Sequence, residues 1–223
     1  MPVDPNSDIE VTAFDWVPDF ARGYVRDFRV RWALEEAGRT YRTRLISALK
    51  RPQDYFAEQP FGQVPAYRDA QVQLFESGAI VLHIASTCDA LLPTDIGGRA
   101  RATAWLVAAL NSVEPMLMEL VTVDVFAAGE DWARLRRPSL VQTIRTRLGH
   151  LADALGRRDF LEEQFTAGDL IMASALRALE STDLLAEHPN LAAYQRRCLE
   201  RPGYGAAIAA QLADFRDDAS IAA

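Results

Sequence analysis

The sequence contains few cysteines and histidines, and both shortages argue against familiar kinds of site. Its two cysteines, Cys88 and Cys198, lie far apart and form no CxxC motif, so we expect reduced, buried residues and no disulfide. The three histidines, His83, His150 and His188, have none of the spacings that are typical of metal ligands. We therefore expect no metal cofactor.

Positive charge is scarce as well. The formal net charge is −7 at pH 7, and Lys50 is the only lysine among 24 basic residues. Because phosphate contacts require a basic surface, this balance argues against a protein that binds nucleic acid. The preference for arginine, together with abundant alanine, is typical of a GC-rich bacterial genome.

Sequence signals for membrane insertion or export are also missing. The first ten residues are polar and acidic and do not resemble a signal peptide. No apolar run approaches the roughly eighteen residues that a membrane span needs. We therefore expect a cytoplasmic protein with no membrane partner.

The most informative stretch runs from Phe61 to Ile84. Two short apolar runs, 64–67 and 72–75, flank a polar turn, which predicts a β-hairpin. After Ser77 the apolar residues recur at helical spacing, which predicts a helix with one buried face. The stretch is thus predicted to form strand, turn, strand and helix.

Two dipeptides in this stretch indicate a binding site. If the Val64–Pro65 peptide bond is cis, the N–H and C=O of Val64 face outward and can pair with an extended peptide ligand. Ser77 lies at a helix start, where free N–H groups attract a carboxylate, and Glu76 can accept a hydrogen bond from an ammonium group. Together these groups suit a small zwitterionic peptide. The alternative, which the local pattern alone favours, is a plain hairpin followed by a serine-capped helix.

The segments PFGQVPAY and LFESGAI, in this order and at this spacing, resemble the glutathione-binding half of the cytosolic glutathione transferases. In that family a cis-proline follows the residue that pairs with the cysteinyl backbone of glutathione. An acidic residue and a serine at the next helix start hold the γ-glutamyl end. The resemblance assigns these roles, in order, to Val64, Pro65, Glu76 and Ser77.

The residues before this stretch complete a thioredoxin-like pattern. Residues 9–14 and 41–46 suit strands. Residues 27–38 carry an apolar stripe that ends at a glycine, and 52–58 suit a short helix. The order strand, helix, strand, helix, strand, strand, helix predicts a mixed sheet. The segment RVRWALEEAG also resembles the first helix of a glutathione transferase.

The resemblance places the catalytic group in the loop before the 27–38 helix. In the family a Tyr, Ser or Cys there acts on the glutathione sulfur, and a hydrogen-bond donor lowers the thiol pKa because it stabilises the thiolate. The loop contains no Ser or Cys and looks longer than the family's pattern; counting back from the helix gives Tyr24. Alternatively, Tyr24 lines the pocket wall, and Arg22, Arg26 or a backbone N–H favours the thiolate.

The loop after residues 41–46 supplies the last site candidates. Glutathione transferases usually present a group here to the glycyl carboxylate, and the resemblance gives that role to Lys50 and Gln53. The alternative is that both are solvated loop residues.

Composition changes at residues 89–98, which we predict to be a linker. It separates a thioredoxin-like domain, residues 1–88, from an all-helical domain, residues 99–223. In the latter we expect a helix over 99–121, kinked or broken at Pro115, and another over Pro138–Leu155.

The segment FTAGDL predicts a buried capping box, with Thr166 as N-cap and Asp169 as the third helical residue, and a staple from Phe165 to Leu170. This signature also marks the helical domain of glutathione transferases. We therefore assign it to the fold and exclude it from the site.

The resemblance implies a homodimeric glutathione transferase-like enzyme that stabilises the glutathione thiolate and transfers it to a hydrophobic electrophile near Trp105, Asn111 and Met116. The missing loop cysteine argues against exchange through a protein–glutathione disulfide. Glutathione-dependent peroxidase, disulfide reductase and isomerase activities stay open. Two alternatives keep the fold: a non-catalytic glutathione or peptide carrier, and a protein-interaction module.

Overall fold

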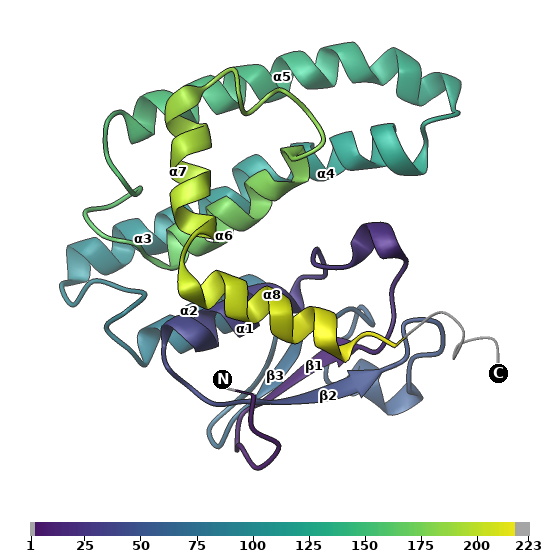
Figure 1. Ribbon diagram of the computed structural model, residues 1–223, viewed down its shortest axis with the longest axis vertical. Coiled ribbons are helices and arrows are strands. Elements are labelled where there is room, and N and C mark those ends of the chain that lie inside the picture. The colour runs from purple at the N-terminus through teal and green to yellow at the C-terminus, as the bar shows by residue number, and fades with distance from the viewer. Residues whose placement is uncertain (1–2, 217–223) are drawn as a thin grey trace. The chain divides into compact units, whose positions relative to one another are not determined.

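The structure, a computed structural model, describes residues 3–216 (Figure 1). Contacts divide the chain into two compact units. The first, here called the sheet unit, comprises the chain up to residue 91 together with the residues from 201 onward. The second, the helical unit, comprises residues 92–200.

The sheet unit is built on a four-stranded sheet in the order β2-β1-β3-β4. β1 (Glu10–Phe14) runs parallel to β2 (Arg42–Ile46) and antiparallel to β3. β3 (Ala66–Arg68) pairs antiparallel with β4 (Gln73–Phe75). This arrangement confirms the predicted mixed sheet.

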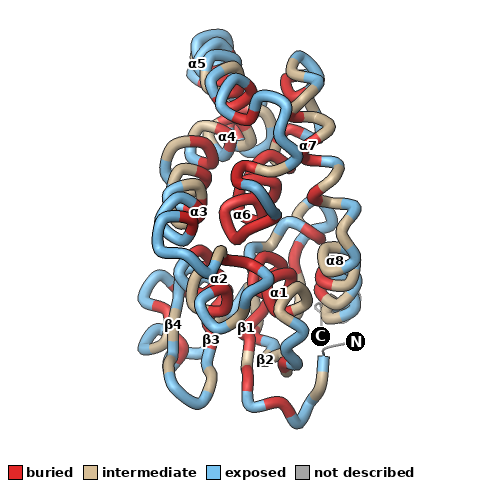
Figure 2. The backbone as a smooth tube through the Cα atoms, turned by 90° about the vertical axis from the view of Figure 1, so that its left-hand side faces the viewer, coloured by how far each residue is buried: buried red, intermediate tan, exposed pale blue. Residues whose placement is uncertain are grey.

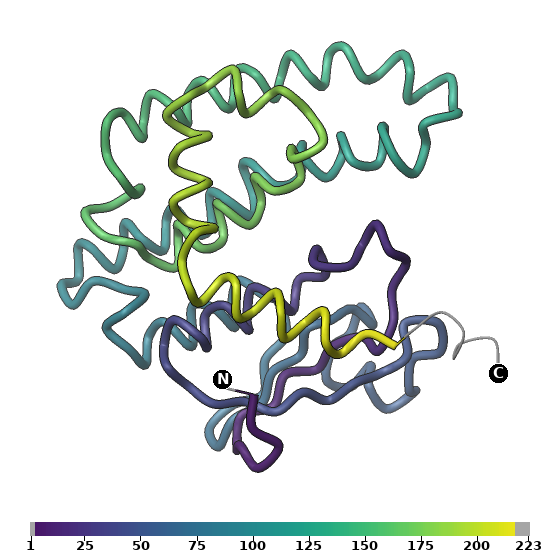
Figure 3. The backbone as a smooth tube through the Cα atoms, in the orientation of Figure 1, coloured from purple at the N-terminus to yellow at the C-terminus, as the bar shows by residue number. Residues whose placement is uncertain are grey.

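Among its described residues, 3–91 and 201–216, the sheet unit also contains five helical segments: η1 (Asp19–Ala21), α1 (Asp27–Glu36), η2 (Gln53–Ala57), α2 (Ser77–Ser86) and α8 (Pro202–Asp214). η1 and η2 are short 3₁₀ helices. α1 packs against α2, β1 and, most extensively, α8 (Figure 3). Because it is covered on several sides, α1 buries Arg31 and Trp32 as well as its predicted apolar stripe.

The predicted domain limits, 1–88, 89–98 and 99–223, stay a prediction. The compact units differ from them in one respect, because α8 belongs with the sheet unit. The predicted linker also overlaps the start of α3, whose N-cap Asp95 accepts a hydrogen bond from the N–H of Gly98.

The helical unit contains no strand among its residues, all of which the structure describes. It consists of these segments: α3 (Ile96–Ala108), η3 (Ala109–Val113), α4 (Glu114–Val121), η4 (Thr122–Phe126), α5 (Asp131–Leu155), α6 (Ala167–Leu176), η5 (Arg177–Leu179) and α7 (Pro189–Leu199).

Prolines affect two of these helices differently. Before Pro115, which lacks an N–H, the helix widens into the π-helical turn η3, so the predicted interruption is present. The predicted start of the next helix at Pro138 is wrong, because α5 begins at Asp131 and Pro138 lies inside it. Ala133 is buried in the first turns, and Arg136 and Arg137 pair with Glu119 and Asp124. We attribute the earlier start to these contacts, which oppose the cost of a proline inside the helix.

One continuous helical stretch, Ile96–Phe126, is long and apolar enough to pass a test for a membrane span, with a mean hydropathy of 1.4 in its best window. The expectation that no apolar run comes near this length is therefore wrong. Core helices of soluble proteins pass the same test. Within the helical unit, α3 and α4 of this stretch pack against α6, and α4 also packs against α5.

α6 lies at the centre of the helical unit, and all its residues are buried (Figure 2). The predicted capping box is present: Thr166 accepts from the helix start, and the Asp169 carboxylate accepts from the N–H of Thr166 at 2.8 Å. Asp169 also accepts hydrogen bonds from the N–H of Leu161 (2.8 Å) and the hydroxyl of Tyr194 (3.0 Å). Phe165 and Leu170, the predicted staple, are both buried.

Candidate functional site

The predicted glutathione-site residues lie in segments that adjoin the strands at one end of the sheet. β1 and β2 end side by side at Phe14 and Ile46. β3 begins at Ala66, which pairs with Phe75 at the end of β4. Tyr24 follows β1, Lys50 and Gln53 follow β2, Val64 and Pro65 precede β3, and Glu76 and Ser77 follow β4.

The Val64–Pro65 peptide bond is cis. Val64 lies just outside the ladder, and its N–H and C=O make no hydrogen bond with any of residues 3–216. Its side chain is buried in a cluster with Ile46, Tyr55 and Ala66. The residue is thus fixed by its side chain, while its backbone N–H and C=O have no hydrogen-bond partner among the described residues.

Sequence reasoning missed the residues that hold the segment before Pro65. The hydroxyl of Tyr55 donates to the carbonyl of Gln63 at 2.6 Å. Burial raises the pKa of Tyr55, so the hydroxyl keeps the proton that it donates. The guanidinium of Arg51 donates to the carbonyls of Gly62 and Ala48. The aromatic pair Tyr55 and Phe56, within the predicted short helix, was a sequence signal for this packing.

Glu76 and Ser77 form the start of α2. Glu76 is the N-cap residue and adopts a φ of 69°, a left-handed conformation that costs a non-glycine residue about 1 kcal/mol or more. No side chain caps this helix start, and Ser77 is its first helical residue rather than its N-cap. The serine-capped alternative therefore does not describe this structure. The first N–H groups of α2 have no side-chain acceptor and, with the helix dipole, favour an anion.

Tyr24 lies between η1 and α1, and the residue is 44% exposed. Its N–H donates to the carbonyl of Ala21 at 3.0 Å. The next residue, Val25, packs against the cluster that contains Val64. The loop that carries Tyr24 is therefore in contact with the cluster to which Val64 belongs.

Lys50 and Gln53 are both exposed, and no side-chain hydrogen bond joins either one to the described part of the chain. The N–H of Lys50 donates to the hydroxyl of Ser47 at 3.1 Å, which shapes the loop. Their role toward a carboxylate stays a prediction.

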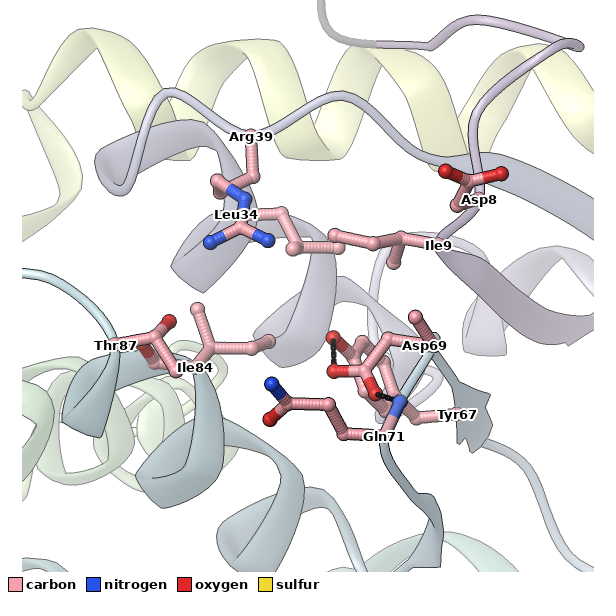
Figure 4. Close-up of a pocket in the computed structure, with 10 residues that line it drawn as sticks. Asp8, Ile9, Leu34, Arg39, Tyr67, Asp69, Gln71, Ile84 and Thr87 are labelled. Atoms are coloured by element: carbon pink, nitrogen blue, oxygen red, sulfur yellow. Dashed lines mark hydrogen bonds between the residues drawn. The ribbon is translucent and has the colours of Figure 1, made fainter.

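A pocket of about 310 Å³ lies at the other end of the strands, near the start of β1 and the β3–β4 turn (Figure 4). None of the predicted glutathione-site residues lines it. Asp69, at the β3–β4 turn, is hydrogen-bonded to His83 at 2.8 Å and to the hydroxyl of Tyr67 at 2.9 Å. It also accepts from the N–H groups of Gln71 and Val72. Burial alone would raise the pKa of Asp69, but these hydrogen bonds hold it well below the usual value. We assign Asp69 to the turn.

Relatives of known sequence resemble most of the chain. Residues 20–86, which include every predicted site residue, match the family model described as glutathione S-transferase, N-terminal domain. A glutathione S-transferase of Hyoscyamus muticus is 30% identical over 165 residues, which cover 67% of this chain and 75% of the relative. Glutathione S-transferase F10 of Arabidopsis thaliana is 29% identical over 161 residues, which cover 68% and 73%.

Solved structures show the same fold. A glutathione transferase from Burkholderia graminis, crystallised with two glutathione molecules bound per subunit, superposes with a TM-score of 0.80 at 23% identity and covers 91% of this chain and 88% of that chain. Poplar glutathione transferase F1 gives a TM-score of 0.78 at 22% identity, with 92% and 98% covered. The sequence relatives and the shared fold agree, and the chain belongs to the glutathione S-transferase family.

Proposed function

We propose that the chain binds glutathione at the end of the sheet where β1, β2 and β4 terminate. We propose further that it transfers the glutathione thiolate to a hydrophobic electrophile. Membership of the family makes it a glutathione transferase-like enzyme. One observation carries the proposal: the unpaired backbone of Val64 lies beside the uncapped start of α2. The pairing of Ala66 with Phe75 places Pro65 and Glu76 next to each other.

Each end of glutathione has a partner of suitable chemistry at this end of the sheet. The N–H and C=O of Val64 pair with the cysteinyl backbone as an added strand does. The γ-glutamyl carboxylate accepts from Ser77 and the first N–H groups of α2, and its ammonium group donates to Glu76. Lys50 and Gln53 hold the glycyl carboxylate.

Tyr24 is the proposed donor to the glutathione sulfur. A donor that lowers the thiol pKa by about two units, roughly 2.7 kcal/mol, makes most of the bound thiol a thiolate at neutral pH. Tyr24 is partly exposed, so it lies at the surface of this loop and not in the core. Arg22 and Arg26, on the same loop, are the alternative source of thiolate stabilisation.

Ultraviolet titration of bound glutathione between pH 5 and 10 tests this function, because the thiolate absorbs and the thiol does not. A pKa well below that of free glutathione is the expected result. Binding with an unshifted pKa would instead indicate a carrier. Failure to bind at all would leave only the fold and favour the interaction module.

A homodimer is proposed from exposed aromatic residues close to the site. Phe61 is 67% exposed and Phe75 38% exposed, and their rings pack edge to face at 6.3 Å. Such a patch suits an interface with a second copy. Light scattering should give the mass of a dimer, and Phe61→Ser should shift the protein toward the monomer.

We also propose a cytoplasmic location in a bacterium. Neither Cys88 nor Cys198 forms a disulfide, which agrees with a reducing compartment. Fractionation of the source cells tests this, and recovery with exported or membrane proteins would contradict it.

A further inference from the structure

The segment before α1 contains short-range backbone hydrogen bonds, such as those from Arg22 to Asp19 and from Tyr24 to Ala21. Residues 15–26 contain only the short η1, and α1 starts at the N-cap Arg26 without a side-chain cap. This segment carries Tyr24, so whatever holds it in place sets the geometry at the glutathione sulfur. Part of this support comes from the other end of the chain.

Gln211, on α8, donates its amide to the carbonyl of Val25 at 2.8 Å and to the carboxylate of Asp27 at 2.6 Å. Val25 follows Tyr24 directly in the sequence. Gln211 is 1% exposed, and a buried amide is costly unless it is hydrogen-bonded. Because both partners are acceptors, the amide nitrogen must face them, and neither a leucine nor a carboxylate could replace it.

A buried ion network extends this contact. The carboxylate of Asp27 accepts from Nε of Arg31 at 2.7 Å, and Nη2 of Arg31 donates to Asp214 of α8 at 2.6 Å. Gln211 and Asp214 lie one helical turn apart on the same face of α8. Two neighbouring positions of α8 thus hold the first turns of α1.

The residues that follow α8 reach the beginning of the same segment. The N–H of Arg216 donates to the carbonyl of Asp15 at 2.8 Å. The guanidinium of Arg22 lies over the ring of Phe215, 5.8 Å from its centre. Residues 15–25 are therefore held at one end by Arg216 and at the other by Gln211.

We infer that Gln211 is a positioning residue for thiolate formation: through Val25 it fixes the segment that presents Tyr24 to the glutathione sulfur. This inference rests on the proposed function. It assigns to α8 a role in the chemistry, although none of its residues was predicted to belong to the site.

Gln211→Leu tests the inference because it keeps the side-chain volume and removes both hydrogen bonds. We expect the pKa of bound glutathione to rise by about one unit and kcat to fall about tenfold, while the dissociation constant of glutathione stays within about twofold. The dissociation constant is spared because Val64, Glu76 and Ser77 lie on other elements. An unchanged thiol pKa and kcat would overturn the inference.

Arg201→Ala is the matched control. Arg201 pairs with Glu36 at 2.6 Å, at the opposite end of the contact between α8 and α1. Its loss weakens the docking of α8 without touching Val25, so the thiol pKa should stay at the wild-type value. A rise equal to that in Gln211→Leu would mean that Gln211 acts only through stability and would overturn the inference.

Hydrogen exchange of residues 15–25 in the free protein separates this inference from the proposed function, because it needs no glutathione. Exchange should be about tenfold faster in Gln211→Leu than in Arg201→Ala. If Gln211→Leu does not fold, Gln211→Asn can replace it, because the asparagine side chain is too short to reach Val25. We expect the same effects in this variant, but smaller ones. Equal exchange in the variants and the control overturns the inference, whereas wild-type protein that does not bind glutathione overturns the proposed function instead.

Discussion

The N-termini of α2 and α6 differ in whether side chains accept hydrogen bonds from their first N–H groups. Each helix begins with N–H groups that have no partner within the helix. At α6 the side chains of Thr166 and Asp169 satisfy them, and the whole start is buried. At α2 no side chain does so, and Glu76 is held in a left-handed conformation. The α6 start thus stabilises the fold, whereas the α2 start has no side-chain acceptor for its N–H groups, as the proposed glutathione site requires.

The largest expected effect is the loss of the α6 cap. Asp169→Ala removes the acceptor for Leu161, Thr166 and Tyr194 together, so we expect the free energy of unfolding to fall by about 3 kcal/mol or more. Urea denaturation measures the change. The glutathione affinity of the folded fraction should not change.

Asp153→Ala is the control for this variant, because Asp153 is an exposed carboxylate on α5. It should alter stability by no more than about 0.5 kcal/mol. If Asp169→Ala is too unstable to study, Thr166→Ala should cost about 1 kcal/mol. A cost as small as that of Asp153→Ala would mean that the α6 cap does not stabilise the fold.

Tyr24→Phe tests the proposed stabilisation of the glutathione thiolate. If the hydroxyl stabilises the thiolate, kcat should fall about tenfold to a hundredfold, with little change in the Michaelis constant for glutathione. Steady-state kinetics with a reactive aryl halide measures both. Full activity in Tyr24→Phe would transfer the role to Arg22, Arg26 or the backbone, and Arg22→Leu and Arg26→Leu would then distinguish among these.

Ser77→Ala tests the open helix start itself. Because Ser77 is not the N-cap, stability should change by less than about 0.5 kcal/mol, whereas glutathione should bind about tenfold more weakly. Calorimetric titration measures the affinity. Ser86→Ala, at the other end of α2, should bind as the wild type does. Equal affinity in the two variants would remove Ser77 from the site.

The sequence predicted the parts of the fold and site that short-range signals determine. Pro65 and Ser77 mark a strand start and a helix start by their own chemistry, and the spacing of Thr166 and Asp169 marks a cap. Gln211 carries no such signal, because its partner Val25 lies 186 residues away. Pro138 misled the prediction, since proline favours the first turn of a helix and the burial that extends α5 upstream leaves little local trace.

The smallest expected effect concerns Asp69, whose carboxylate accepts from backbone N–H groups of the β3–β4 turn and not from a helix start. Burial raises the pKa of Asp169, whereas hydrogen bonds, led by that from His83, lower the pKa of Asp69. A lowered pKa in the folded state means that Asp69 contributes stability above its unfolded-state pKa of about 3.9, and that this contribution is lost as the pH falls toward the folded-state value. Asp69→Asn should therefore be less stable than the wild type at pH 7, and the difference should shrink between about pH 4 and pH 2.5. Urea denaturation across this range measures the difference. A gap that stays constant with pH would show that the ionised carboxylate of Asp69 adds nothing to the stability of the β3–β4 turn.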